Sequence, residues 1–118
     1  MQTVLVCGGR DYDDEARLFS ILDVANAANP IKLLVYGSAP GADELAGRWA
    51  RHAGVHHKLY PANWKEEGEA AGQKRNQRML DDAQPDLVIA FPGGVGTADM
   101  VRRSEKAGVP IVKIRPHT

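Results

Sequence analysis

Five short apolar segments recur along the chain, each bounded by glycine, proline or polar residues. Four of them are rich in valine, isoleucine and leucine and alternate little, which is typical of strands buried on both faces of a parallel sheet. The third segment is more polar, which favours a position at the edge of the sheet. We therefore predict five strands: TVLVC (3–7), IKLLVY (31–36), VHHKLY (55–60), DLVIAF (86–91) and PIVKI (110–114).

Amphipathic segments fill the gaps between these strands. Apolar residues recur three and four positions apart within 18–25 and 42–53, as on one face of a helix. A long polar helix is predicted from about 67 to 83, and a last helix follows Thr97 and ends near Gly108. This alternation indicates an α/β fold in which right-handed crossovers place helices on both faces of a parallel sheet. With the strands numbered in chain order, the predicted sheet order is 3-2-1-4-5.

The composition narrows the class of protein. A chain of 118 residues is expected to form a single domain, 1–118, around one core. Lysine plus arginine balance aspartate plus glutamate at 15 each, which argues against a generic nucleic-acid binder. With one cysteine, Cys7, the chain forms no internal disulfide, and its N-terminus lacks the pattern of a signal peptide. Because no apolar run is long enough to span a membrane, we expect a soluble, cytoplasmic protein.

Glycine-rich loops follow three of the predicted strands. Parallel sheets bind ligands beyond the carboxyl ends of their strands, where the strand order reverses, and these loops are expected to converge there. Glycine allows close approach to the backbone, and free N–H groups at the start of the next helix attract a phosphate. Turn geometry explains the glycines of any one loop, but three converging loops favour a ligand. The expected ligand-binding residues in the loops are Gly8, Gly9, Arg10, Gly37, Ser38, Gly41, Asp43, Pro92, Gly93, Gly94, Gly96 and Thr97.

The predicted helix at 67–83 carries three basic residues. Arg75 and its neighbour Asn76 are expected to face the ligand, where an arginine can clamp a phosphate through two hydrogen bonds. Lys74 and Arg78 are expected instead to lie on a solvated face. There they would pair with acidic residues nearby in the sequence, namely Glu66, Glu67, Asp81 and Asp82.

Several motifs, in their order and spacing, resemble those of a known family. The segment PGGVGT (92–97) resembles the PGGxGT signature of the SLOG superfamily, which includes the LONELY GUY (LOG) phosphoribohydrolases and the DprA recombination mediators. Across nearly the whole chain the closer resemblance is to the small YspA/YpsA-related SLOG proteins of bacteria and their phages. The motifs that carry it are VCGGRDYDD, GSAPGADELAGRWA, PANW, AGQKRNQRML and DLVIAFPGGVGTADMVRRSEKAGVPI. The resemblance implies a Rossmann-like, three-layer α/β/α fold and a nucleotide or nucleotide-derived ligand.

The resemblance to the LOG enzymes also bears on catalysis. Those enzymes cleave the N-glycosidic bond of nucleoside 5′-monophosphates and carry the motif PGGxGTxxE, with an arginine on a preceding helix. The arginine corresponds to Arg75, but Met100 occupies the position of the glutamate. If the chain is an enzyme, the candidate catalytic residues are Arg75 and Asp99, with Asp43 and Asp11 as alternative carboxylates. We nevertheless expect Asp99 to act mainly as a favourable charge near the helix N-terminus.

Two further features of the sequence bear on ligands. Trp64 is expected on a loop, where stacking on a base and covering an apolar edge are equally favoured. His56 and His57 point to opposite faces of a strand, so no metal site is expected, and no cofactor is implied.

Three functions follow as hypotheses. The first is binding or sensing of a nucleotide-like small molecule without strong catalysis, because Met100 replaces the glutamate of the LOG motif. The alternative is a LOG-like phosphoribohydrolase. A DprA-like binder of single-stranded DNA is disfavoured by the neutral charge and the few aromatic residues. The resemblance also implies a homodimer or higher homo-oligomer, because LOG relatives build sites between subunits.

Overall fold

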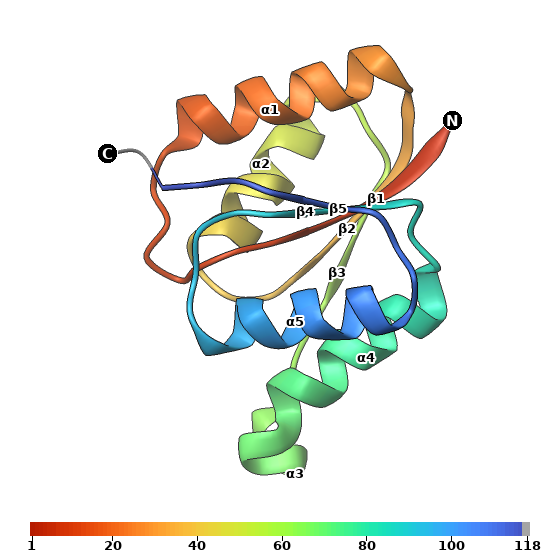
Figure 1. The fold of residues 1–118 in the computed structure, drawn as a ribbon. Helices are drawn as coiled ribbons and strands as arrows, with labels where there is room; N and C mark the ends of the chain where they lie inside the picture. Colours follow the sequence, from red (N-terminus) through yellow and green to blue (C-terminus); the bar gives the residue numbers. More distant parts are fainter. Residues whose placement is uncertain (117–118) are drawn as a thin grey trace.

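A five-stranded parallel sheet forms the centre of the computed structural model, which describes residues 1–116 (Figure 1). The elements are, in chain order, β1 (Gln2–Cys7), α1 (Glu15–Ala28), β2 (Ile31–Gly37), α2 (Ala42–Ala53), β3 (His57–Tyr60), α3 (Trp64–Glu67), the 3-10 turn η1 (Gly68–Ala70), α4 (Ala71–Ala83), β4 (Leu87–Ala90), α5 (Val95–Lys106) and β5 (Ile111–Lys113). The strand order is β3-β2-β1-β4-β5, and each neighbouring pair is parallel. The predicted α/β fold and the predicted sheet order are therefore confirmed.

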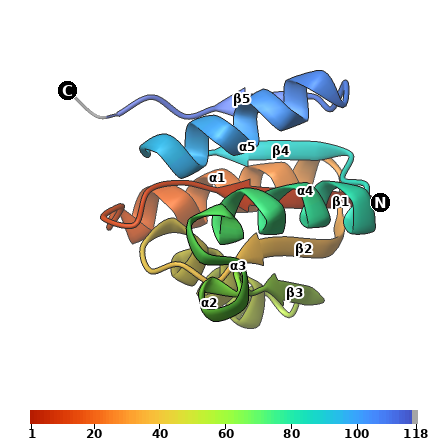
Figure 2. The same ribbon diagram turned by 90° about the horizontal axis from the view of Figure 1, so that it is seen from below.

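Helices cover both faces of the sheet, with α1 and α2 on one side and α4 and α5 on the other (Figures 1 and 2). Successive residues of a buried strand point to opposite faces, so each strand contributes to both layers. In β1, Val4 and Val6 belong to the cluster beneath α1 and α2, whereas Leu5 and Cys7 belong to the cluster beneath α4 and α5. This explains why the strand sequences are continuously apolar.

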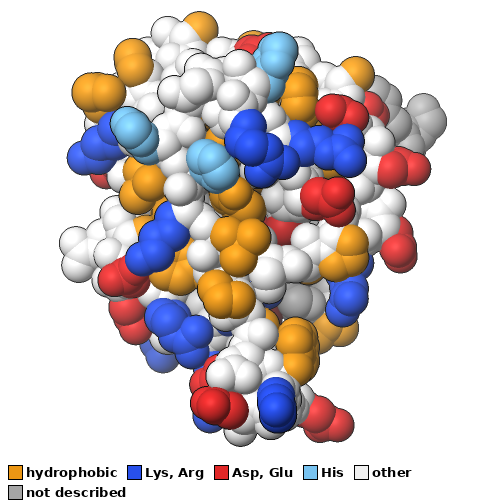
Figure 3. Space-filling model, turned by 180° about the vertical axis from the view of Figure 1, so that it is seen from behind, with side chains coloured by type: hydrophobic (Ala, Val, Ile, Leu, Met, Phe, Trp, Pro, Cys, Tyr) orange, Lys and Arg blue, Asp and Glu red, His pale blue; other side chains and the backbone are white. Residues whose placement is uncertain are grey.

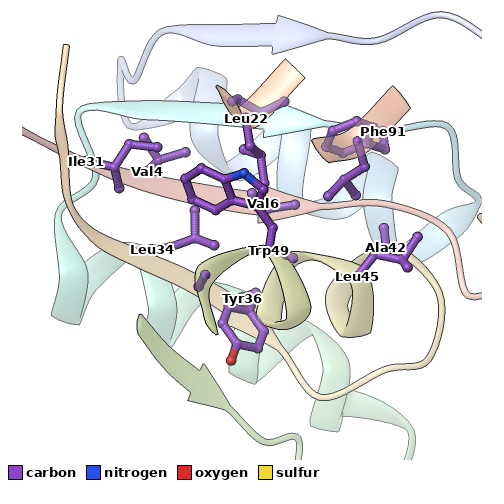
Figure 4. Packing of buried hydrophobic residues seen from close by; sticks show 14 residues of the cluster. Val4, Val6, Leu22, Ile31, Leu34, Tyr36, Ala42, Leu45, Trp49 and Phe91 are labelled. Atoms are coloured by element: carbon purple, nitrogen blue, oxygen red, sulfur yellow. The ribbon is translucent and has the colours of Figure 1, made fainter. Parts of the chain in front are cut away.

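The layer of α1 and α2 is built around Trp49, whose indole lies among aliphatic side chains from the strands and from α1 (Figure 4). The side chain is fully buried, and its Nε1 donates a hydrogen bond to Asp23 Oδ1 at 2.9 Å. A buried indole needs such a partner because an unpaired N–H away from water is costly. Trp49 is therefore a structural residue of the core.

Capping groups set several helix ends. Asp14 precedes α1 and accepts a hydrogen bond from the Arg17 N–H at 3.1 Å. Gly54 after α2 and Gly108 after α5 have φ values of 68° and 75°, in the left-handed region that glycine enters at least cost. The helix end predicted near Gly108 is therefore confirmed.

The segment predicted as one long helix at 67–83 is divided. Asn63 Oδ1 accepts a hydrogen bond from the Glu66 N–H at 3.2 Å and begins the short helix α3. Gly68, with φ of 59°, ends α3, and α4 begins only after η1. Trp64 thus lies in a helical turn, so the predicted loop position was wrong. The last helix also starts earlier than predicted, at Val95 rather than after Thr97.

The strand β3 lies at one edge of the sheet, as the polarity of its segment predicts. Its residues His57, Lys58 and Leu59 are exposed. On the face seen from behind, basic, acidic, histidine and apolar side chains are interspersed (Figure 3). Charges of both signs are thus mixed on this face of the molecule.

Candidate functional site

The loops after β1, β2 and β4 meet at Gly9. Its N–H donates to the Pro92 carbonyl at 2.9 Å, and its own carbonyl accepts from the Ala42 N–H at 3.1 Å. Gly41, with φ of 79°, packs against the Gly9 and Arg10 carbonyls so closely that an added Cβ would overlap them. Backbone hydrogen bonds therefore hold the three loops together at the carboxyl edge of the sheet.

A cavity of about 340 Å³ lies between these loops and α3, α4 and α5. Its volume is within the range of small-molecule sites in proteins. Ten of the residues that the sequence predicts to bind a ligand line it: Gly8, Gly9, Arg10, Gly37, Asp43, Arg75, Asn76, Gly94, Gly96 and Thr97. The cavity therefore brings together residues from the end of β2, the loop after β1, the N-cap of α5 and the helices α2, α4 and α5.

Four of the expected residues lie outside the cavity lining: Ser38, Gly41, Pro92 and Gly93. Instead, they shape the loops. The Pro92 carbonyl and Gly41 contact Gly9 as described above, and a Cβ at Gly93 would lie 2.7 Å from the Gly9 nitrogen. The Ser38 hydroxyl accepts a hydrogen bond from the Ala62 N–H at 3.4 Å, which ties its loop to the segment after β3.

The N-terminus of α5 opens into the cavity. Gly94 is the N-cap residue, and among the described residues no side chain caps this end, so the Thr97 hydroxyl does not act as the cap. The first N–H groups of a helix have no partner within the helix, and here they belong to Val95, Gly96 and Thr97. Together with the helix dipole, they form a place that favours a negative charge.

Arg75 reaches the cavity from α4. Its Nη1 donates to the Tyr60 carbonyl at 3.2 Å, and its Nε donates to Asn76 Oδ1 at 3.1 Å. Burial lowers the pKa of Arg75, and the negative charge of Asp43 works in the opposite direction. An arginine nevertheless stays protonated at neutral pH, so the cavity contains a fixed positive charge.

Asp43 supplies a buried carboxylate to the same cavity from the first turn of α2. Asp43 is only 6% exposed, and its Oδ2 accepts a hydrogen bond from the Ala39 N–H at 3.1 Å. Burial raises the pKa of Asp43 from 3.8 to about 6, although hydrogen bonds from the backbone and the charge of Arg75 partly oppose the rise. The group is thus close to titration just below neutral pH.

Asp99 has a different role from the one predicted. It lies beyond the first turn of α5 and is buried, so it is not a charge at the helix N-terminus. Its carboxylate accepts hydrogen bonds from Asn76 Nδ2 at 3.0 Å and Arg103 Nε at 2.8 Å, and it is also bonded to Arg102. Burial acts to raise the pKa of Asp99, but these hydrogen bonds and charges outweigh burial and hold it below its ordinary value. Asp99 therefore joins α4 to α5.

Comparison with known proteins identifies the family. The sequence profile of the YspA, cpYpsA-related SLOG family matches residues 2–66. The chain is also 38% identical over 120 residues to Gene 61 protein of Mycobacterium phage D29, covering 95% of each protein. It belongs to the YspA, cpYpsA-related SLOG family. The predicted membership is thereby confirmed.

A solved structure gives an independent view of the fold of this SLOG protein. The chain superposes on UDP-GlcNAc 2-epimerase from Neisseria meningitidis, crystallised with UDP-GlcNAc, with a TM-score of 0.60. The match covers 97% of this chain but 32% of the epimerase chain, at 15% identity. At that identity the likeness shows a shared α/β fold.

Several predictions about single residues of this SLOG protein can be compared with the structure. Lys74 and Arg78 pair with Glu67, at 3.9 and 3.4 Å, as expected for a solvated face. Met100 is buried and lines the cavity, where its thioether brings no charge. Asp11 is exposed and does not line the cavity, so it is not a carboxylate of this site.

The sequence prediction missed eight residues that line the cavity: Val6, Cys7, Ala39, Glu69, Gly72, Gln73, Met79 and Val95. Glu69 and Gln73 come from η1 and the start of α4, whose break was not predicted. A signal for the partners of Asp99 was present, because Arg102 and Arg103 stand three and four residues later, the spacing of neighbours on one helix face.

The remaining chemistry of the described residues is limited. Burial raises the pKa of the Cys7 thiol to about 12, and the charge of Asp43 adds to this effect, so Cys7 is not an activated nucleophile. Residues 1–116 contain no group of three or more His, Cys, Asp or Glu placed to hold a metal ion. Within the same residues, every helix is too short or too polar to cross a membrane.

Proposed function

We propose that this protein binds a nucleotide or nucleotide-derived ligand, as a sensor or ligand-binding module, with a phosphate at the N-terminus of α5. The observation that carries the proposal is that this open helix end borders the same cavity as the guanidinium of Arg75. Free N–H groups, the helix dipole and an arginine are the donors that a phosphate needs. Membership of the SLOG family and the α/β fold are compatible with such a ligand.

The glycines of α5 support a ligand rather than turn geometry. A Cβ added at Gly94 or Gly96 would meet no atom of the described chain within 4 Å. Gly96 lies within the helix and has no positive φ, so neither the local packing nor the backbone requires glycine at this position. Glycine there is explained if another molecule approaches the backbone closely.

Isothermal titration calorimetry tests the proposal with AMP, ADP-ribose, NAD, cyclic ADP-ribose and UDP-GlcNAc. We expect at least one to bind, and we expect the Arg75→Ala variant to lose that affinity. A folded protein that binds none of them, and that releases no nucleotide on denaturation when examined by mass spectrometry, would contradict the proposal.

A second candidate function is hydrolysis of the N-glycosidic bond of a nucleoside 5′-monophosphate. The observation in its favour is Asp43, a buried carboxylate that lines the cavity beside Arg75 and is ionised at neutral pH. In such a reaction water adds to C1′ while the C1′–N bond breaks, and the base leaves with a proton. A carboxylate can stabilise the positive charge that develops on the sugar.

Chromatography of nucleoside 5′-monophosphates incubated with the protein tests this second function. Free base and ribose 5-phosphate should appear in equal amounts, and Asp43→Asn should abolish their release. Binding without release of base leaves the protein as a binding module, whereas activity that survives in the Asp43→Asn variant would exclude Asp43 as the carboxylate.

A further inference from the structure

Trp64 stands at the rim of the cavity, with 56% of the residue exposed to solvent. A large aromatic residue is mostly buried in a folded protein, so such exposure is unusual. The side chain is not on a loose loop, because Asn63 caps α3 before it and Gly68 ends α3 after it. The fold therefore fixes the backbone from which the indole extends beside the cavity.

One edge of this indole rests on α4. A Cβ added at Gly72 would lie 3.4 Å from Cη2 of Trp64, which is ordinary contact distance. Arg75 stands three residues after Gly72, so it lies close to Gly72 on the surface of α4. The indole of Trp64, which comes from α3 and contacts α4 at Gly72, thus borders the same cavity as the guanidinium of Arg75 from α4.

The other exposed apolar residues show that this position is distinctive. Of the large hydrophobic residues exposed within 1–116, Met1, Val24, Leu59 and Val112 lie away from the cavity, and only Trp64 and Val95 line it. Val95, which is 87% exposed, belongs to the first turn of α5. Of these two residues, Val95 lies at the helix end proposed to hold the phosphate, and Trp64 is the aromatic one.

We propose that Trp64 stacks on the base of a nucleoside 5′-phosphate whose phosphate is held at the N-terminus of α5. This inference rests on the function proposed above and adds the ligand class to it, a phosphate joined through a sugar to an aromatic base. Every base has a π face, so stacking on tryptophan strengthens binding with little dependence on which base is present. Ribose 5-phosphate offers the same phosphate without a base.

The two tryptophans allow a direct measurement. Trp49 is fully buried in the layer of α1 and α2, on the face of the sheet opposite α4, and Trp64 is the exposed one. A ligand-dependent change in tryptophan fluorescence therefore reports on Trp64. We expect AMP to quench the fluorescence of the wild-type protein and ribose 5-phosphate to bind without quenching.

Variants of Trp64 separate stacking from packing. Trp64→Ala should weaken AMP binding by about 10- to 100-fold in calorimetry, the range found when stacking aromatics are truncated, and leave ribose 5-phosphate affinity unchanged. Trp64→Phe should retain most of the AMP affinity, because phenylalanine also presents a π face. Leu59→Ala removes an exposed apolar side chain away from the cavity and should change neither affinity.

Three outcomes would overturn the inference while leaving the proposed function in place. These are AMP binding without any fluorescence change, equal loss of AMP and ribose 5-phosphate affinity in Trp64→Ala, and wild-type binding of ribose 5-phosphate as tight as that of AMP. If Trp64→Ala fails to fold, the wild-type fluorescence titration and Trp64→Phe still decide. If neither AMP nor ribose 5-phosphate nor any other nucleotide binds, the proposed function fails and this inference fails with it.

Discussion

Arg75 and Asp43 approach the same glycine from two different helices. A Cβ added at Gly37 would collide with the guanidinium of Arg75 and lie 2.7 Å from Asp43 Oδ2. Each of the two groups favours the charged form of the other, because the charge of Asp43 raises the pKa of Arg75 and that of Arg75 lowers the pKa of Asp43. The carboxyl end of β2 thus supports a pair of opposite charges at the cavity.

Gly37→Ala should disturb both charged groups at once. The new methyl group must displace Arg75 or Asp43, and overpacking of this kind costs about 1–3 kcal/mol of stability. We expect a lower free energy of unfolding in urea and a loss of nucleotide binding in calorimetry. Wild-type stability together with wild-type affinity would show that the two side chains move aside freely.

Gly96→Ala should separate folding from binding. The added methyl group meets nothing within 4 Å in the described chain, and alanine is a better helix former than glycine by about 1 kcal/mol. We therefore expect the melting temperature to stay the same or rise while nucleotide affinity falls, because the methyl group obstructs approach to the backbone of α5. Unchanged affinity would argue against a phosphate at this helix end.

Arg75→Ala should weaken nucleotide binding by about tenfold or more, since a hydrogen bond to a charged group contributes roughly 1.5–3 kcal/mol. Arg78→Ala is the matched control, because Arg78 lies one turn later on α4 and pairs with Glu67 outside the cavity. Calorimetry on both variants checks the prediction. An equal effect of the two substitutions would point to long-range charge rather than a contact in the cavity.

Asp43→Asn should change how stability depends on pH. Because burial raises the pKa of Asp43 to about 6, the folded protein retains a proton between about pH 4 and 6 that the unfolded chain releases. The contribution of Asp43 to stability is therefore present below about pH 4 and is lost as pH rises through the folded pKa. The free energy of unfolding of Asp43→Asn, relative to that of the wild type, should therefore rise by on the order of 2 kcal/mol from about pH 4 to about pH 7.

Urea denaturation of the wild type and of Asp43→Asn at about pH 4 and about pH 7 measures this difference in the free energy of unfolding. Asp81→Asn, which replaces an exposed carboxylate on α4, serves as the control for the loss of one negative charge. A pH-independent difference between wild type and Asp43→Asn would contradict a raised pKa of Asp43.

Asp99→Ala should destabilise the packing of α4 on α5. The substitution removes one acceptor of the Asn76 amide and one of the Arg103 guanidinium, which costs about 1–3 kcal/mol. The pKa of Asp99 is held below its ordinary value, so its contribution is present above about pH 4 and is lost as pH falls further. In thermal unfolding at neutral pH, the melting temperature should fall much more in Asp99→Ala than in Asp81→Ala.

The fold was predictable because its main signals are local. Continuous apolar segments separated by amphipathic ones indicate a parallel sheet covered by helices, and the observed order β3-β2-β1-β4-β5 agrees with the predicted one. The break at Gly68 was missed, because helical spacing continues across it and the positive φ of one glycine decides the outcome.

The site was predictable only in part. The amino-acid sequence by itself determined which loops carry glycine, that these loops follow neighbouring strands, and that Arg75 belongs to the helix beside them. Only the tertiary structure decided that Arg75 and Asp43 meet at Gly37, and that Asp99 is bound by Asn76 from another helix. Periodicity describes each element alone, whereas these contacts depend on how α2, α4 and α5 pack across the sheet. Both Asp43 and Asp99 line the cavity, but the same packing engages the Asp99 carboxylate with side chains of α4 and α5, whereas Asp43 is bonded to a backbone N–H.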